Sequence, residues 1–182
     1  MNRMNTEIEE QSTVELNISS KHKGDITENR ASEIITLSSN GNLTCYAPNT
    51  DDDGIDLIIN PKSEFKPLFI QVKSRFVLQK SGRFVQNVGK KTFSANKNFY
   101  LLFVFFNQKS LEVEKLWLIP SDDFASLAYD KKEGKTYKSF YRFNAGPKSE
   151  KDKWAKYSVD KSELGNKLLQ VININYNAGN IN

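Results

Sequence analysis

Two apolar, strand-like runs carry polar residues at a fixed phase, and they constrain the fold more than any other feature of this chain. The first covers residues 53–59 (DGIDLII) and the second covers residues 69–74 (FIQVKS). Side chains alternate across a strand, so Gln71 and Lys73 share one face and the intervening residues point to the other. A polar group inside an apolar strand costs free energy unless it is paired or binds something. These positions are therefore expected to have partners.

The two runs are expected to pair as an antiparallel hairpin through the turn at 61–66. Asp56 begins the first strand, and the turn lies between the two runs. Asp56 should therefore lie beside the end of the partner strand that carries Gln71 and Lys73. Fourteen residues, 57–70, separate Asp56 from Gln71. An Asp, a Gln and a Lys that converge from neighbouring strands indicate a small metal site that acts on phosphate.

A helix is expected to precede these strands. It would open at Gly24 and Asp25, with Asp25 as the N-cap and Glu28 as the acid of a capping box. Residues 38–42 (SSNGN) would end it.

Apolar patterns predict further elements. The continuously apolar run at 99–107 is typical of a central strand that is buried on both faces, and Ser121 is expected to cap a short helix. Residues 76–98 are polar and basic, and no element is assigned to them. The remaining expected elements are strands at 43–47 and 115–119, an edge strand at 137–143, and a last helix from 160 or 161 to 172.

The size and composition of the chain favour one folded domain. It has 182 residues, of which 38% are hydrophobic and 26% are charged, which is enough to bury a core and too apolar for disorder. The expected organisation is a polar N-terminal segment at 1–22, a single α/β domain at 23–172, and an Asn-rich tail at 173–182 that frays.

Several classes of protein are excluded by what the chain lacks. Cys45 is the only cysteine, so one chain cannot form an internal disulfide, a cysteine-rich zinc site or an iron–sulfur cluster; a buried structural thiol is expected. His22 is the only histidine and lies in a polar stretch, where it is interpreted as a linker residue rather than a catalytic base. The N-terminus has no apolar segment typical of a signal peptide. The longest apolar run is too short to cross a bilayer, so a cytoplasmic protein without membrane contact is expected.

The net charge of +4 is compatible with a polyanionic partner without identifying one. Arg75 lies on the same strand face as Lys73 and extends its positive surface. Further basic residues follow, interleaved with Phe84, Phe93 and Asn96, and they would either contact phosphates without reading sequence or form a solvated loop. These residues are Lys80, Arg83, Lys90, Lys91 and Lys97.

Taken in order, the helix acid Glu28, the Gly-Ile-Asp-Leu run at 54–57 and the Ile-Gln-Val-Lys-Ser run at 70–74 resemble the core of the PD-(D/E)XK nuclease superfamily. The resemblance is to the variant in which Gln replaces the second acid, and it covers residues 24–75. It implies a restriction-endonuclease-like fold, which is a mixed central β-sheet flanked by helices. It also implies a hydrolase, most directly a DNA endonuclease that cleaves phosphodiester bonds with Mg²⁺ or Mn²⁺.

The resemblance assigns a role to each matching residue. Asp56, Gln71 and Glu28 would hold the metal, and Lys73 would orient or deprotonate the attacking water or offset charge on the phosphate. Gln71 carries one negative charge fewer than an acid, which favours a single metal. The acidic loop at 51–53 would either compensate or remain solvated, and Gly54-Ile55 stands where the superfamily has its proline.

Other interpretations of these residues stay open. Glu28 fits a capping box alone, Glu33 is the fallback helix acid, and Lys73 fits an edge-strand lysine whose charge reaches solvent. The chain would then be a catalytically inactive member of the fold that binds nucleic acid or protein, or an unrelated α/β protein. Nucleases of this superfamily often form homodimers, but the sequence indicates no interface and no protein partner.

Overall fold

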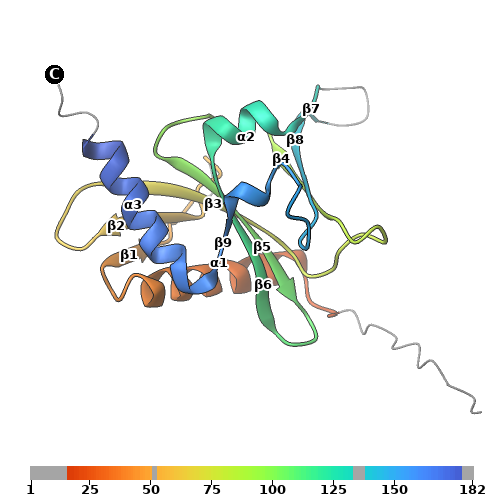
Figure 1. Ribbon diagram of the computed structural model, residues 1–182, viewed down its shortest axis with the longest axis horizontal. Helices are drawn as coiled ribbons and strands as arrows, with labels where there is room; N and C mark the ends of the chain where they lie inside the picture. The colour runs from red at the N-terminus through yellow and green to blue at the C-terminus, as the bar shows by residue number, and fades with distance from the viewer. Residues whose placement is uncertain (1–15, 51–52, 133–137, 178–182) are drawn as a thin grey trace, which may run out of the picture.

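The computed structural model describes residues 16–50, 53–132 and 138–177. Within them, six strands form a main sheet in the order β1-β2-β3-β5-β6-β9 (Figure 1). β3 and β5 run parallel, and the other neighbouring pairs run antiparallel. The strands are β1 (Leu43–Tyr46), β2 (Leu57–Pro61), β3 (Leu68–Arg75), β5 (Phe99–Asn107), β6 (Glu112–Pro120) and β9 (Ser158–Val159).

A second, three-stranded sheet in the order β4-β8-β7 lies against one face of the main sheet within the described residues. Helices alone were expected to flank the main sheet, and no element was expected at 76–98, so this second sheet was not anticipated. Its strands are β4 (Phe84–Gly89), β8 (Phe140–Ala145) and β7 (Tyr129–Lys131). The helices are α1 (Ser20–Ser38), α2 (Ser121–Leu127) and α3 (Leu164–Asn177), with single 3₁₀ turns at Ala155–Tyr157 and Lys161–Glu163.

The predicted hairpin and the predicted central strand are both confirmed. β2 pairs antiparallel with β3, with Leu57 opposite Ile70. All residues of β5 except Asn107 are buried, because β3 and β6 flank it and both of its faces are covered. The protein is a mixed α/β domain built on a mostly antiparallel central sheet.

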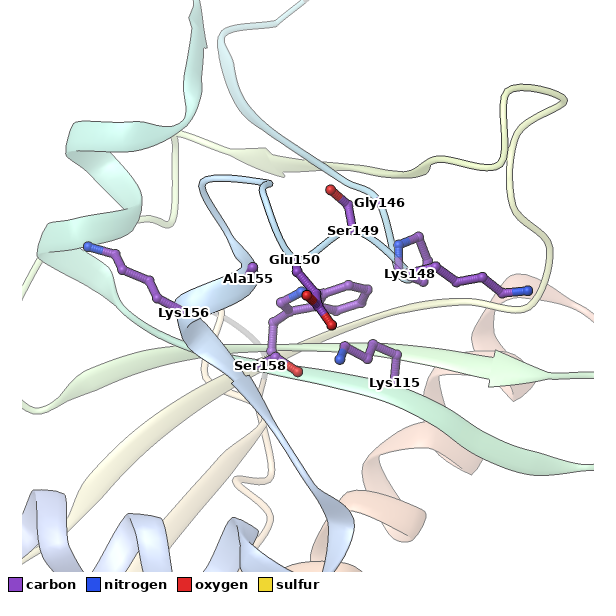
Figure 2. Close-up of a pocket in the computed structure, with 10 residues that line it drawn as sticks. Lys115, Gly146, Lys148, Ser149, Glu150, Ala155, Lys156 and Ser158 are labelled. Carbon is purple, nitrogen blue, oxygen red and sulfur yellow. The ribbon is translucent and has the colours of Figure 1, made fainter.

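Aromatic side chains fill the space between the two sheets. Phe103 of β5 stacks on Phe143 of β8 with ring centroids 3.9 Å apart, and Trp154 lies 4.9 Å from Phe143. Such rings supply large buried apolar area. At the rim of this cluster lies a cavity of about 570 Å³ beside β6, with Lys115 on its floor (Figure 2).

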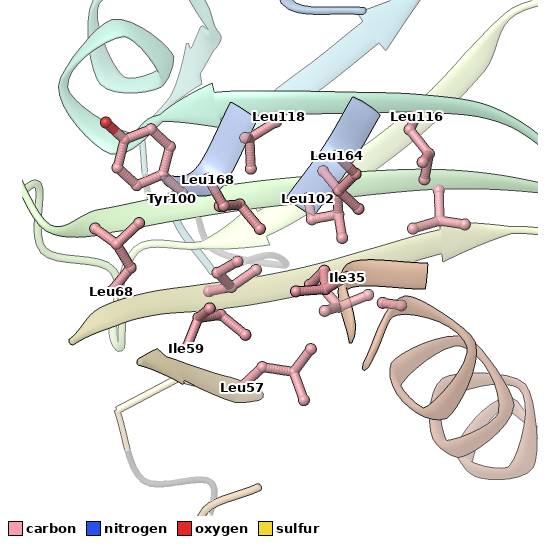
Figure 3. Packing of buried hydrophobic residues seen from close by; sticks show 14 of the residues in the cluster. Ile35, Leu57, Ile59, Leu68, Tyr100, Leu102, Leu116, Leu118, Leu164 and Leu168 are labelled. Carbon is pink, nitrogen blue, oxygen red and sulfur yellow. The ribbon is translucent and has the colours of Figure 1, made fainter. Parts of the chain in front are cut away.

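The opposite face of the main sheet is covered by α1 and α3 (Figure 3). Ile35 of α1 and Leu164 and Leu168 of α3 are fully buried there against the sheet's aliphatic side chains. Gly165 lets the two helices approach, because a Cβ at this position would lie only 2.6 Å from the Ile35 carbonyl oxygen. One face is therefore covered by helices and the other mainly by a second sheet.

Two expected helix caps are wrong. α1 begins five residues before Asp25, with Ser19 as its N-cap, and the Ser19 hydroxyl accepts a hydrogen bond from the His22 amide at 3.2 Å. His22 therefore lies in the first turn of a helix rather than in a linker. Ser121 is the first residue of α2 and not its cap. Its hydroxyl instead bridges the backbone of Asn96, at 2.8 Å from the amide nitrogen and 2.9 Å from the carbonyl oxygen.

The C-terminal half also differs from expectation. The strand expected at the edge of a sheet is β8, which has β4 on one side and β7 on the other. α3 continues to Asn177, five residues into the segment expected to fray, and the Tyr176 hydroxyl donates to the Pro67 carbonyl at 2.9 Å. Residues 1–15 of the expected N-terminal segment, Asp51, Asp52, Tyr137 and the last five residues lie outside the described residues. No helix in the described ranges is long and apolar enough to cross a membrane.

Candidate metal-dependent phosphate site

The candidate site lies where β2 ends and β3 continues. The pairing of β3 with β2 stops at Ile70, whereas its pairing with β5 continues to Arg75. Asp56 sits at this divergence. Its amide donates to the Ile70 carbonyl at 2.9 Å, and its Oδ2 accepts a hydrogen bond from the Val72 amide at 2.6 Å. The carboxylate is thus held in place by the backbone of the neighbouring strand.

Lys73 lies close to this carboxylate. Its Nζ is 3.9 Å from Asp56 Oδ2, and the two side chains are 27% and 10% exposed. A charge pair this sheltered is screened less by salt than a surface pair. The predicted approach of Asp56 and Lys73 from neighbouring strands is therefore present in the structure.

Gln71 is the next residue of β3 after the Leu57–Ile70 pair, between the two residues whose backbone binds Asp56. It is 5% exposed, and its Oε1 has no hydrogen-bond partner among the described residues. Leaving a buried acceptor unpaired costs about 1–3 kcal/mol. An oxygen in this position beside a carboxylate is suited to a hard cation.

Gly54 shapes the space around Gln71. It adopts a left-handed φ of +66°, and a Cβ on it would lie 2.6 Å from Gln71 Nε2 and 3.1 Å from Thr92 Oγ1. Two physical reasons therefore favour glycine at position 54. Its backbone has a φ angle that residues with a side chain disfavour, and a Cβ there would lie too close to the Gln71 amide. No feature of the sequence predicted that Thr92 would pack beside Gly54.

Glu28 reaches the site from α1. It lines a cavity of about 470 Å³ together with Lys73 and Gln86, and an adjoining cavity of about 530 Å³ together with Asp56. Because α1 begins at Ser20, the capping-box interpretation of Glu28 is wrong. The fallback acid, Glu33, is exposed and pairs with Arg30 at 3.6 Å. Gln86 was not predicted to line the cavity that contains Glu28 and Lys73.

The donor set fits a small hard cation. Two carboxylates and one amide oxygen surround the divergence of β2 and β3, and Mg²⁺ prefers oxygen ligands while keeping several waters. The described residues contain no group of three His, Cys, Asp or Glu side chains placed to hold a metal. A metal site here therefore requires the unpaired Oε1 of Gln71, and its modest charge fits one ion better than two.

The predicted nucleic-acid contacts fall into two groups. Lys80 and Lys91 are exposed, and Arg75 uses its Nε to donate to the Val85 carbonyl at 2.8 Å. Arg83 Nη2 lies 2.9 Å from Asp152 Oδ2, and Lys90 Nζ lies 2.5 Å from Asp130 Oδ1. The charges of Arg83 and Lys90 are therefore partly neutralised, and those of Lys80, Lys91 and Arg75 are better placed for phosphates. All five assignments stay predictions.

The cavity of about 570 Å³ near β6 contains none of the predicted site residues. Glu150 is the one carboxylate on its wall, and Figure 2 shows the ammonium groups of Lys148 and Lys156 directed away from its centre. It lacks the oxygen ligands that a metal-dependent phosphate site needs.

Comparison with solved structures places the fold beside a nuclease. The chain is similar to a bacterial homing endonuclease, I-Ssp6803I, with a TM-score of 0.55 and 19% sequence identity, over 88% of this chain and 98% of that chain. No family model matches the chain, and no curated protein matches it. At this identity the likeness establishes a shared nuclease-like fold.

Proposed function

We propose that the protein is a metal-dependent endonuclease of the PD-(D/E)XK type that hydrolyses phosphodiester bonds in DNA. The observation that carries the proposal is the buried, unpaired Oε1 of Gln71, which lies between the two β3 residues whose backbone binds Asp56. Lys73 lies beside Asp56 and lines a cavity together with Glu28. The fold likeness to a homing endonuclease supports the same reaction class.

Each residue has a distinct task in this proposal. Asp56, Gln71 and Glu28 hold Mg²⁺ or Mn²⁺, and the ion supplies Lewis acidity to the scissile phosphate and to the attacking water. The Val72 amide binds Asp56 Oδ2 and so fixes the rotamer of this side chain. Asp56 Oδ1 is therefore already oriented, and metal binding costs little further side-chain entropy. Lys73 orients the attacking water and offsets the negative charge that grows on the phosphate.

The substrate and the setting belong to the same proposal. Lys80, Lys91 and the Nη groups of Arg75 contact backbone phosphates, and Arg83 and Lys90 add to the positive field around them. A homodimer would bring two such sites to the two strands of a duplex. A cytoplasmic location and the absence of membrane contact remain predictions from the sequence.

The test is cleavage as a function of Mg²⁺ or Mn²⁺ concentration on duplex, single-stranded and branched DNA. Asp56→Asn is the matched variant, because the asparagine Oδ1 can still accept the Val72 hydrogen bond while the charge is lost. We expect metal-dependent cutting that falls about 10²-fold or more in Asp56→Asn. Glu33→Gln, which removes an exposed carboxylate from the same helix as Glu28, should cut like the wild type.

The alternative is a catalytically inactive member of the same fold that binds nucleic acid or protein. It predicts no cutting on any substrate and no calorimetric binding of either metal. That pair of results would replace the proposal, and cutting that is unchanged in Asp56→Asn would overturn the assignment of the site.

A further inference from the structure

The small second sheet has an outer face whose chemistry differs from that of its buried face. On β4 and β8 the buried face carries Phe84, Val88 and Phe143. Side chains alternate, so the outer face carries the residues between them, and register places Asn87 opposite Arg142 and Val85 opposite Asn144. Among the described residues, the outer positions of these two strands include no carboxylate.

Neighbouring side chains orient Arg142 on this outer face. Its Nε donates to Asn87 Oδ1 at 3.0 Å, and its guanidinium lies 5.1 Å from the centroid of the Phe140 ring. Within the described part of the chain, Nε makes the side chain's one hydrogen bond, which leaves both Nη groups for a ligand. Asn144 is anchored similarly, because its Oδ1 accepts from Arg83 Nε at 2.8 Å while its amide NH₂ stays available.

The outer face is joined to the candidate site. Gln86 of β4 lines the cavity that contains Lys73 and Glu28. Asn87 is the next residue, and its side chain lies on the other face of the same strand. Arg75 at the end of the site strand donates to the Val85 carbonyl of β4. Figure 1 shows β4, β7 and β8 on the opposite side of the main sheet from α1. β4 is thus shared by the candidate cavity and the outer face, and a duplex that reaches both would pass over β4.

We propose that the outer face of β4 and β8 enters the major groove of duplex DNA and that Arg142 reads a guanine through its two Nη groups. Arginine binds guanine O6 and N7 in a bidentate manner. Neighbouring strands lie about 4.8 Å apart, and the groove of B-form DNA is about 12 Å wide and admits a two-stranded β-ribbon such as β4 and β8. β7 pairs with the other side of β8 and places Tyr129 opposite Arg142, at the edge of this ribbon. The major groove of A-form RNA is deep and narrow, so the same face selects DNA. This inference deepens the proposed function and rests on it for bringing the duplex to the site.

The test measures sequence-selective binding in the full chain with cleavage blocked by Asp56→Asn. A random duplex DNA pool is selected on this protein, and the enriched sequence is then compared with duplexes that differ from it by one base pair. We expect a preference that includes a G·C pair. Adding Arg142→Met should reduce discrimination at that pair by about 10-fold to 100-fold, while affinity for random duplex changes less than about threefold. Lys167→Met, which removes a positive charge from α3, should leave the preference intact.

Arg142→Lys keeps the charge and loses the planar fork, so it should lose the same discrimination. If circular dichroism shows that Arg142→Met does not fold, the result for Arg142→Lys alone decides the test. Absence of any preferred sequence, or an unchanged preference in a folded Arg142 variant, would overturn the inference. Metal-dependent cutting without sequence preference would leave the proposed function standing and remove the inference. If the wild-type protein never cuts DNA but shows sequence selectivity that depends on Arg142, the inference would stand and the proposed function would be rejected.

Discussion

Gly54 is the residue on which the shape of the candidate site depends most directly. We predict that Gly54→Ala destabilises the protein more than Gly41→Ala does. Both glycines have positive φ, +66° and +72°, so both substitutions carry strain of about 1–2 kcal/mol. A Cβ at Gly41 would meet nothing within 4 Å, whereas at Gly54 it would meet Gln71 Nε2. The extra cost at Gly54 should be about 1–3 kcal/mol.

Denaturant unfolding of the two variants measures this difference directly. Under the proposed function, cleavage should fall at least about 10-fold in Gly54→Ala, since a displacement near 1 Å at a site costs that much or more. Equal loss of stability in the Gly54 and Gly41 variants would mean that the Gln71 amide is not packed against this glycine.

The unpaired oxygen of Gln71 leads to a second prediction at this scale. Gln71→Glu places a carboxylate in a buried position beside Asp56, and like charges in close proximity destabilise one another. In EDTA the variant should unfold at a lower temperature than the wild type. In Mg²⁺ it should gain more thermal stability than the wild type gains, because the added charge strengthens cation binding and binding stabilises the folded state. A gain from Mg²⁺ no larger than that of the wild type would argue against metal coordination at this position.

Cys45 gives a pH-dependent prediction. Burial raises the pKa of its thiol, and this effect outweighs the hydrogen bonds with Ser32 and Thr36, which lower it. The unfolded thiol, with a pKa of about 8.5, ionises before the folded one. The contribution of Cys45 to stability is therefore complete below that pH and is lost as pH rises through the folded pKa.

The free energy of unfolding should consequently decline between about pH 8 and pH 10 more steeply in the wild type than in Cys45→Ala. Parallel denaturant titrations across that range measure the difference. Burial also raises the pKa of Tyr100, but that contribution is common to both proteins and cancels. A constant difference between the two curves would contradict the prediction.

The positions of single residues were predictable where strand alternation determines them. Gln71 and Lys73 fall on one face because of the period of two, and the short hairpin brings Asp56 beside Lys73. The N-cap residues of the helices could not be predicted as reliably. Ser19, Asp25 and Ser121 are all good capping residues, and packing of the helix against the sheet decides which of several such residues begins it.

At the scale of elements, the contact between α1 and α3 depends on Gly165. We predict that Gly165→Ala destabilises the protein by about 1–3 kcal/mol or more. The added Cβ would meet the backbone of Ile35, Ser38 and Ser39, and backbone in a helix end cannot move aside as a flexible side chain can. Denaturant unfolding measures the cost.

The control for this contact is Ser38→Ala. The Gly165 amide donates to Ser38 Oγ at 2.7 Å, and Ser38 Oγ donates to the Ile34 carbonyl at 2.6 Å. This variant therefore removes two hydrogen bonds, each worth about 1 kcal/mol, and adds no bulk. If Gly165→Ala were no more costly than Ser38→Ala, close helix packing would not be what this glycine provides.

Elements with a strong local period were predictable, and those that depend on distant partners were not. β5 is a continuous apolar run, and its position in the centre of the sheet follows from that alone. β4 is polar on one face and lies in a stretch of charged residues, so its hydrophobic signal is confined to Phe84 and Val88. Its pairing with β8, more than fifty residues later, has no local sequence signature.

At the scale of the whole molecule, two unlike layers cover the main sheet, and the candidate site lies where the sheet divides. The helical layer supplies Glu28 and β4 supplies Gln86 to the lining of the same cavity. Asp56 and Lys73 lie between them on the sheet itself. A nucleic acid that binds this cavity would therefore contact both layers, on the side of the molecule where the cavity opens.

This asymmetry gives a prediction for the salt dependence of binding to duplex DNA. Each phosphate neutralised by a protein cation contributes about −0.9 to the slope of log affinity against log salt concentration. Lys80 and Lys91 are exposed before and after β4, the strand whose Gln86 lines the candidate cavity, whereas Lys62 and Lys167 are exposed on the β2–β3 turn and on α3. All four variants lose charge equally when lysine becomes methionine, so only position distinguishes the two pairs.

The double variant of Lys80 and Lys91 should lose up to about 1.8 units of slope and bind all duplex sequences more weakly by a similar factor. The double variant of Lys62 and Lys167 should keep the wild-type slope, apart from a small change due to net charge. Fluorescence anisotropy of a labelled duplex from about 50 to 200 mM salt covers the range in which such slopes are resolved. Equal slopes in the two double variants would mean that the general positive charge of the chain, and not the neighbourhood of the site, attracts the duplex.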